Sequence, residues 1–178
     1  MSQSALKIPK QQVPMTIWVH PEGQVAGAIF LNLPGSDSHG TEQPCDVLNE
    51  SADFLVIMRS DPEGVRFYNK SSIVRVEYRD DTRFPAEDGK PLPCRVIMMD
   101  GVLIDGEFCK ALPAEQPRLS DYVRDTRERF FKLRLAGGDM TLVNKSYVVY
   151  ISELEAQTRA EQSGEAGPAD GDPRRLAG

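Results

Sequence analysis

Two stretches of the chain begin with the same three residues and continue with a similar alternation of apolar and polar residues. They read NKSSIVRVEY at residues 69–78 and NKSYVVYISE at residues 144–153. Internal similarity of this kind decides the domain organisation, because each repeat of such a sequence is one structural unit. The two stretches predict that one small unit occurs twice in the chain.

The similarity extends towards the N-terminal side of both stretches. The first unit contains MTIWVHPEGQVAGAIFLNLPG from residue 15, and the second contains CRVIMMDGVLIDGEFCKALPA from residue 94. Each has an apolar run, an acidic residue followed by glycine, a second glycine and then Leu-Pro, in that order. The middle segments CDVLNESADFLVI and SDYVRDTRERFFKL align more loosely. Matches in the same order through both units predict a tandem duplication.

Each unit shows the pattern of five short strands. An acidic residue followed by glycine between two alternating apolar runs predicts a hairpin, because both residue types tolerate the positive φ that tight turns require. Gly23 and Gly101 occupy these turns. Gly27 and Gly106 fall inside the second strand of each hairpin, where glycine typically marks a bulge or a sharp bend.

The expected strands follow the same spacing in both units, and a short helical stretch precedes the third strand. In the first unit we expect strands at 15–20, 24–32, 54–60, 64–69 and 72–78, with the helical stretch at 46–51. In the second we expect strands at 94–99, 102–109, 130–136, 139–144 and 147–152, with the helical stretch at 119–125. Such short strands bury a core by curling into a barrel, which also removes exposed edges.

The predicted fold class is therefore mainly β, with two tandem five-stranded barrels, each carrying a short helix or a long loop insertion. The tail contains no aromatic residue and one large aliphatic residue, Leu176, so it has too little apolar surface to offset the entropy of ordering. The predicted organisation is a flexible arm at 1–13, a first repeat at 14–79, a linker at 80–92, a second repeat at 93–155 and a disordered tail at 156–178.

The motifs of both units resemble those of Sm-like proteins. VIMMDGVLIDGEF at residues 96–108 resembles the first Sm signature, and LVNKSYVVYI at residues 142–151 resembles the end of the second. The resemblance covers residues 15–78 and 94–154 and implies two small Sm-like barrels, as in small-barrel proteins of bacteria whose function is uncharacterised. Sm-like proteins assemble edge to edge into rings, so three copies of a tandem chain would make a six-place ring.

Many Sm-like proteins also bind RNA at the inner rim of the ring, but this chain departs from them there. The place that holds an acidic residue and an asparagine in Sm proteins holds a long turn with Leu-Pro. The net charge is −6, whereas proteins that bind nucleic acid usually carry a basic stripe. The resemblance therefore implies the fold and the pairing of edges, and nucleic acid is not the expected partner.

Other classes of protein are disfavoured by what the sequence lacks. It has no apolar run of the ~20 residues that cross a membrane and no signal peptide, so we expect a cytoplasmic protein that does not insert into membranes. The cysteines Cys45, Cys94 and Cys109 form no CxxC pair, and the two histidines have no metal-ligand spacing. We expect no metal, no cofactor and no catalytic residue, and so no enzyme.

The candidate binding residues are the two repeated polar turns: Asn69, Lys70 and Ser71, and Asn144, Lys145 and Ser146. Under one interpretation they are equivalent binding sites, in which lysine contacts an anion and asparagine is a hydrogen-bonding clamp. Under the other they are turn chemistry, because asparagine and serine bond their own backbone and lysine points to solvent.

The basic and aromatic stretch RDTRERFFKLR at residues 124–134 has two readings as well. It is either a patch for an acidic partner or a nucleic-acid phosphate, or it is a helix end that enters a strand, with Phe130 or Phe131 in the core. Acidic neighbours within the stretch favour the second reading.

The predicted function is a protein-interaction or assembly module. Its partner would be another protein or a further copy of the chain, bound through sheet edges and loops. The alternative is a protein that binds RNA or a small anion through the repeated Asn-Lys-Ser turns.

Overall fold

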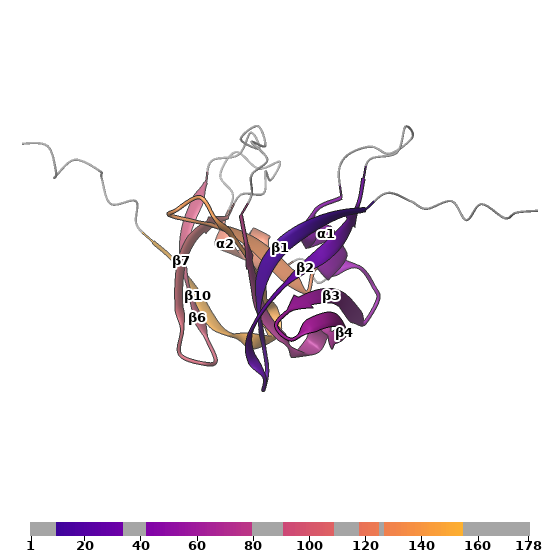
Figure 1. Cartoon of the computed structure of the whole chain (residues 1–178). Helices are drawn as coiled ribbons and strands as arrows, with labels where there is room; N and C mark the ends of the chain where they lie inside the picture. The colour runs from indigo at the N-terminus through magenta and orange to yellow at the C-terminus, as the bar shows by residue number, and fades with distance from the viewer. Residues whose placement is uncertain (1–9, 34–41, 80–90, 109–117, 125–126, 155–178) are drawn as a thin grey trace, which may run out of the picture.

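A computed structural model describes residues 10–33, 42–79, 91–108, 118–124 and 127–154. Residues 1–9 of the predicted arm at 1–13, most of the linker, the tail and Cys109 lie outside the described residues. The described chain is mainly β, as predicted (Figure 1).

The two halves of the chain contain the same kinds of elements in the same order. The first half consists of β1 (Lys10–Val19), β2 (Gly23–Asn32), α1 (Pro44–Asn49), β3 (Phe54–Ser60), β4 (Glu63–Asn69), the 3-10 helix η1 (Lys70–Ser72) and β5 (Ile73–Tyr78). The second consists of β6 (Leu92–Met98), β7 (Leu103–Phe108), α2 (Leu119–Val123), β8 (Phe130–Leu135), β9 (Met140–Asn144), the 3-10 helix η2 (Lys145–Tyr147) and β10 (Val148–Glu153).

These bounds lie close to the predicted ones, because local alternation and turn glycines determine them. The first strand is the main difference. It begins at Lys10, inside the predicted arm, since β2 extends to Asn32 and Lys10 pairs with that residue. Gly23 and Gly101 lie in the first hairpin of each half with φ of +93° and +83°, the left-handed region that favours glycine.

The strands form one antiparallel sheet with the order β10-β6-β7-β8-β9-β5-β1-β2-β3-β4. Each half contributes its strands in the same internal order, and the halves join where β5 pairs with β9. The two closed barrels predicted from the sequence are not confirmed: the sheet is single and open, with β4 and β10 at its ends. The reason is that the edges of β5 and β9 pair with each other across the halves. In Figure 1, β3 and β4 lie on one side of the molecule and β6, β7 and β10 on the other.

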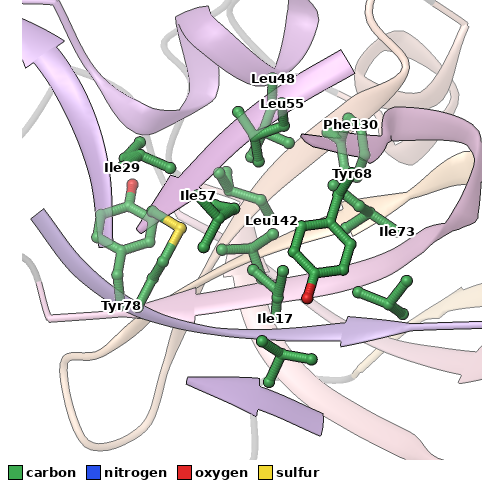
Figure 2. Packing of buried hydrophobic residues seen from close by; sticks show 14 of the residues in the cluster. Ile17, Ile29, Leu48, Leu55, Ile57, Tyr68, Ile73, Tyr78, Phe130 and Leu142 are labelled. Atoms are coloured by element: carbon green, nitrogen blue, oxygen red, sulfur yellow. The ribbon is translucent and has the colours of Figure 1, made fainter. Parts of the chain in front are cut away.

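The halves also share their hydrophobic cores. Phe130 and Leu142 of the second half pack among the core residues of the first half, as Figure 2 shows. Val74 of β5 belongs to the core of the second half in return. The strands β5 and β9 are therefore covered on both faces. Phe130 and Phe131 are both buried, in different cores, because successive strand residues point to opposite faces.

Gly27 and Gly106 allow the third strand of each half to approach the second. A Cβ on Gly27 would lie 2.6 Å from the carbonyl oxygen of Met58, and a Cβ on Gly106 would lie 2.9 Å from that of Arg134. Pairing of β2 with β3 begins at Gly27, and pairing of β7 with β8 begins at Gly106. The missing side chain is thus required by the closeness of the neighbouring backbone.

Candidate interaction site at the sheet edges

Both Asn-Lys-Ser turns cap a one-turn 3-10 helix that leads into the last strand of each half. The side-chain oxygen of Asn69 accepts a hydrogen bond from the backbone N–H of Ser71 at 2.9 Å. The oxygen of Asn144 accepts one from the N–H of Ser146 at 3.0 Å. This is the local bonding expected of asparagine at a turn.

Lys70 uses its ammonium group inside the protein. The side chain is 1% exposed, and its Nζ donates to the carbonyl oxygens of Val47 and Glu50 at 2.6 and 3.1 Å. These carbonyls lie at the end of α1, where helix geometry leaves acceptors without partners. Burial lowers the pKa of Lys70, because desolvation disfavours the charged form. An external anion would have to displace these carbonyls to reach the ammonium.

The second lysine, Lys145, lies half-buried at the equivalent position. Its backbone N–H donates to the carbonyl of Arg129 at 3.0 Å, as the N–H of Lys70 donates to that of Asp53 at 2.8 Å. The backbones of the two turns are therefore held in the same way, by the residue before the third strand.

The two asparagines differ in what surrounds them. Asn144 is fully buried, and its Nδ2 donates across the junction to the carbonyl oxygens of Ile73 at 2.7 Å and Lys70 at 3.3 Å. Asn69 is exposed, and within the described residues its Nδ2 makes no corresponding bond. One turn therefore lies at an interface between halves, and its counterpart lies at the open end of the sheet.

Further polar contacts close the junction between the halves. The side chain of Asn49, at the end of α1, donates to the carbonyl of Phe130 at 2.9 Å and accepts from its N–H at 2.8 Å. The hydroxyl of Tyr147 donates to the carbonyl of Ser71 at 3.1 Å. These bonds satisfy backbone groups that the shared core removes from water.

The outward face of β3 and β4 carries apolar residues that have buried counterparts in the second half. We call two residues equivalent when they occupy the same register position in the two halves. The equivalent pairs on this face are Phe54 and Phe130, Val65 and Met140, and Phe67 and Leu142. The three residues of the second half are at most 2% exposed, because they pack into the first half. Phe54, Val65 and Phe67, which we call the β4 patch, are 55%, 44% and 68% exposed.

The other end of the sheet shows the same contrast. The last strand of each half has an irregular register at the same place, so Val149 of β10 is equivalent to Val74 of β5. Val74 is 9% exposed and packs in the core of the second half, whereas Val149 is 58% exposed. Tyr150 beside it is also exposed. We call Val149 and Tyr150 the β10 patch.

Sequence reasoning selected the polar turns and missed both apolar patches. A signal was present in β3, whose residues 54–57 are four successive large apolar residues, FLVI. A strand with one face in water alternates apolar and polar residues, whereas a continuous apolar run indicates a strand that is covered on both faces. In the first half, the hydrophobic core covers only one face of β3.

A small pocket lies between α1 and the second half. It measures about 260 Å³, and its lining includes Cys45, Phe108, Tyr122 and Phe131. Burial, followed by the charge of Glu128, raises the pKa of the Cys45 thiol to about 11. A thiol in this environment stays protonated and weakly nucleophilic at neutral pH.

Among the described residues, no three histidine, cysteine or acidic side chains are grouped so that they can hold a metal ion. None of the helices in that part of the chain has the length and apolar character to span a membrane. Comparisons of the chain with protein-family models, with curated proteins and with solved structures give no match.

Proposed function

We propose that this protein is a non-enzymatic assembly module that binds other polypeptides by extending its sheet at β4 and β10. One observation carries the proposal: equivalent apolar positions are buried where a neighbouring unit is present and exposed where the sheet ends. The outer strand of an open sheet also offers unpaired N–H and C=O groups to an incoming strand.

The matching order of elements in the two halves supports the interpretation that the chain is a duplicated unit that assembles through its strand edges. Both halves have the same succession of elements, the same strand order and an irregular register in the last strand. These features support a tandem duplication of a small Sm-like unit. They also support the use of strand edges for assembly, since one such edge contact already joins the two halves.

The size of the β4 patch indicates reversible binding. Burial of one large apolar side chain contributes about 1.5–3 kcal/mol when it is complete. Three partly exposed side chains therefore contribute roughly 3–6 kcal/mol, to which new backbone hydrogen bonds add about 1 kcal/mol each. Association costs about 4–15 kcal/mol in lost freedom of motion. Because these favourable and unfavourable free energies are similar in size, the fraction of protein that is bound depends on the concentration of the partner.

The alternative function, binding of RNA or a small anion through the Asn-Lys-Ser turns, has less support. The ammonium of Lys70 is buried against α1, and the net charge of the chain is −6. Phosphate binding needs accessible cationic groups and weakens steeply as salt rises.

Affinity capture from the native host tests the proposal against this alternative. The tagged protein is compared with a double variant, Phe67→Lys with Val149→Lys, which places a charge in both the β4 patch and the β10 patch. The matched control is Met99→Lys, since Met99 is 65% exposed in the turn between β6 and β7. We expect capture of polypeptides that survives nuclease treatment, is lost in the double variant and is retained in Met99→Lys. Capture that nuclease abolishes, or that the double variant leaves intact, contradicts the proposal.

A further inference from the structure

We propose that the pocket between α1 and the second half binds a small aromatic ring that carries a cationic amino group. We call this space of about 260 Å³ the junction pocket, because residues of α1 from the first half and of β7, α2 and β8 from the second half line it. The proposal does not depend on the binding of polypeptides at β4 and β10. It adds a small-molecule ligand to the protein.

The floor of the junction pocket consists of stacked aromatic side chains. The ring of Phe108 stacks on that of Tyr122 with their centroids 4.7 Å apart, and its centroid lies 5.3 Å from that of Phe131. The three side chains are at most 5% exposed, whereas the polar residues that line the pocket are half-buried or exposed. The rings therefore form the floor and the polar groups form the mouth. Aromatic rings are surfaces on which a further ring packs in an offset or edge-to-face geometry.

The first half has a cavity of similar size at the equivalent place, but that cavity is built differently. It measures about 250 Å³, and all of its lining residues among those described come from the first half itself. By strand register and by place in the helix, the positions equivalent to the three rings hold Ile29, Val47 and Leu55. Its aromatic side chains, Phe30 and Phe54, come from other positions. The shared fold therefore does not require the stacked aromatic floor, which is a feature of the second half.

The volume of the junction pocket sets the size of its ligand. An apolar cavity of about 150 Å³ is large enough to bind benzene, whereas drug-sized ligands occupy pockets of about 300–1,000 Å³. The junction pocket, at about 260 Å³, lies between these sizes. It can therefore hold one aromatic ring with a short substituent, or two fused rings.

The charged groups at the mouth favour a cation. Among the described residues that line the pocket, two carboxylates, Asp46 and Glu128, outnumber one ammonium, that of Lys132. Burial, followed by the charge of Glu128, raises the pKa of the Cys45 thiol to about 11, against a smaller opposite effect of Lys132. The effect of Glu128 on this thiol has the sign that disfavours an anion and favours a cation. A cation beside aromatic rings also gains cation–π attraction.

These features define how the ligand would lie. Its ring packs on Phe108 and Phe131, and its amino group lies at the mouth, where it donates to the carboxylates. The carboxylate of Asp46 is already held in place, because it accepts a hydrogen bond from the backbone N–H of Gln43 at 2.9 Å. A group that is ordered before binding loses little conformational freedom when the ligand arrives. Since both halves line the pocket, the ligand stabilises the junction between them.

Titration of the isotope-labelled full chain with phenethylamine at neutral pH, followed by NMR, tests the proposal. Hydrocinnamate has a similar shape and the opposite charge, and cyclohexylethylamine keeps the amine but lacks the aromatic ring. We expect saturable shifts of the amides of Cys45, Phe108 and Phe131, with no comparable shifts at Ile29 and Leu55 in the first half. Affinity should be roughly tenfold lower for hydrocinnamate and roughly fivefold lower for cyclohexylethylamine.

Variants of the two carboxylates test the role of charge. Glu128→Gln and Asp46→Asn should each weaken the binding of phenethylamine roughly three- to tenfold, because each removes one partner of the amino group. Asp46 also caps α1, so the matched control is Asp121→Asn. Asp121 accepts from the N–H of Arg118 at 2.9 Å, at the same position of α2, and it does not line the pocket. This control should bind phenethylamine as the unchanged protein does.

Two measurements at Cys45 test the location of the site. Cys45→Phe fills the pocket and should abolish the shifts at Phe108 and Phe131, with circular dichroism as the check that the variant retains its β structure. In the unchanged protein, saturating phenethylamine should slow the alkylation of Cys45 by iodoacetamide severalfold. The alkylation test needs no substitution, so it decides the location even if Cys45→Phe does not fold.

Several results would overturn the proposal. One is the absence of saturable shifts around the junction pocket up to the highest soluble concentration of phenethylamine. Others are shifts centred on Ile29 and Leu55, an affinity for hydrocinnamate that equals or exceeds that for phenethylamine, or binding that Glu128→Gln and Cys45→Phe leave unchanged. None of these outcomes bears on the capture of polypeptides at β4 and β10, so the proposed function is tested separately.

Discussion

Replacing Asn144 by alanine is predicted to destabilise the protein far more than the same change at Asn69. The two residues cap equivalent 3-10 helices through the same oxygen-to-backbone bond. They differ because only Asn144 lies at the junction, where its Nδ2 donates to the carbonyls of Ile73 and Lys70. The pair therefore isolates the contribution of the junction from that of the cap.

The expected magnitudes follow from these contacts. Loss of the cap costs about 1 kcal/mol at either site. At Asn144, which is fully buried, the change also removes a donor to the carbonyl of Ile73, whereas the carbonyl of Lys70 keeps the N–H of Ile73. An unsatisfied buried acceptor costs about 1–3 kcal/mol. We expect Asn144→Ala to lower the free energy of unfolding by about 3 kcal/mol and Asn69→Ala by about 1 kcal/mol.

Urea unfolding followed by circular dichroism measures both values, at a concentration where the chain is monomeric. The slope of the transition should stay unchanged, so that the midpoint reports stability. Equal losses for the two variants would refute the reasoning, because they would show that the bonds across the junction contribute nothing beyond the cap.

Three further predictions concern the fold and the junction. Gly27→Ala should lower the free energy of unfolding by about 1–3 kcal/mol, because its Cβ would press on the backbone of β3. The control is Gly137→Ala, whose Cβ would meet no atom within 4 Å and which should change the free energy of unfolding by less than about 1 kcal/mol. A similar loss of stability in both variants would contradict this explanation of Gly27. Asn49→Ala should lower the free energy of unfolding by about 2 kcal/mol, because it leaves the N–H and carbonyl of Phe130 without their partner, and a neutral effect in thermal unfolding would count against the clamp. Cys45 should react with iodoacetamide at pH 8.5 roughly 100-fold more slowly than an ordinary thiol, because burial raises its pKa from 9.0 to about 11 and the thiolate forms only as pH rises through that value. Peptide mapping over a pH series measures the rate of alkylation. A rate equal to that of the unfolded chain would contradict the prediction.

The strands could be predicted from the sequence because short-range features determine them. Alternating apolar residues and a turn glycine place the first hairpin of each half, and β3 was predicted at its observed bounds. The joining of the halves could not be predicted in this way. The same alternation fits a unit that closes on itself and a unit that pairs its edge with a neighbour, and the pairing of β5 with β9 is a contact between distant segments.

For the candidate residues, too, the local contacts could be predicted from the sequence and the long-range contacts could not. The capping bonds of Asn69 and Asn144 follow from local turn chemistry, which the sequence indicates. The burial of Lys70 does not, because its acceptors lie in α1, some twenty residues earlier in the chain. A lysine in a polar turn usually points to solvent, and only the tertiary position of the helix end reverses that expectation.

Hydrogen–deuterium exchange of the isolated chain tests the central claim most directly. If the sheet is continuous through β5 and β9 and open at its ends, then amides of Ile73–Tyr78 and Met140–Asn144 are protected. The outward amides of Glu63–Asn69 and Val148–Glu153 exchange faster, because no neighbouring strand of the described chain covers them. The account is contradicted if β5 and β9 exchange as fast as β4 and β10.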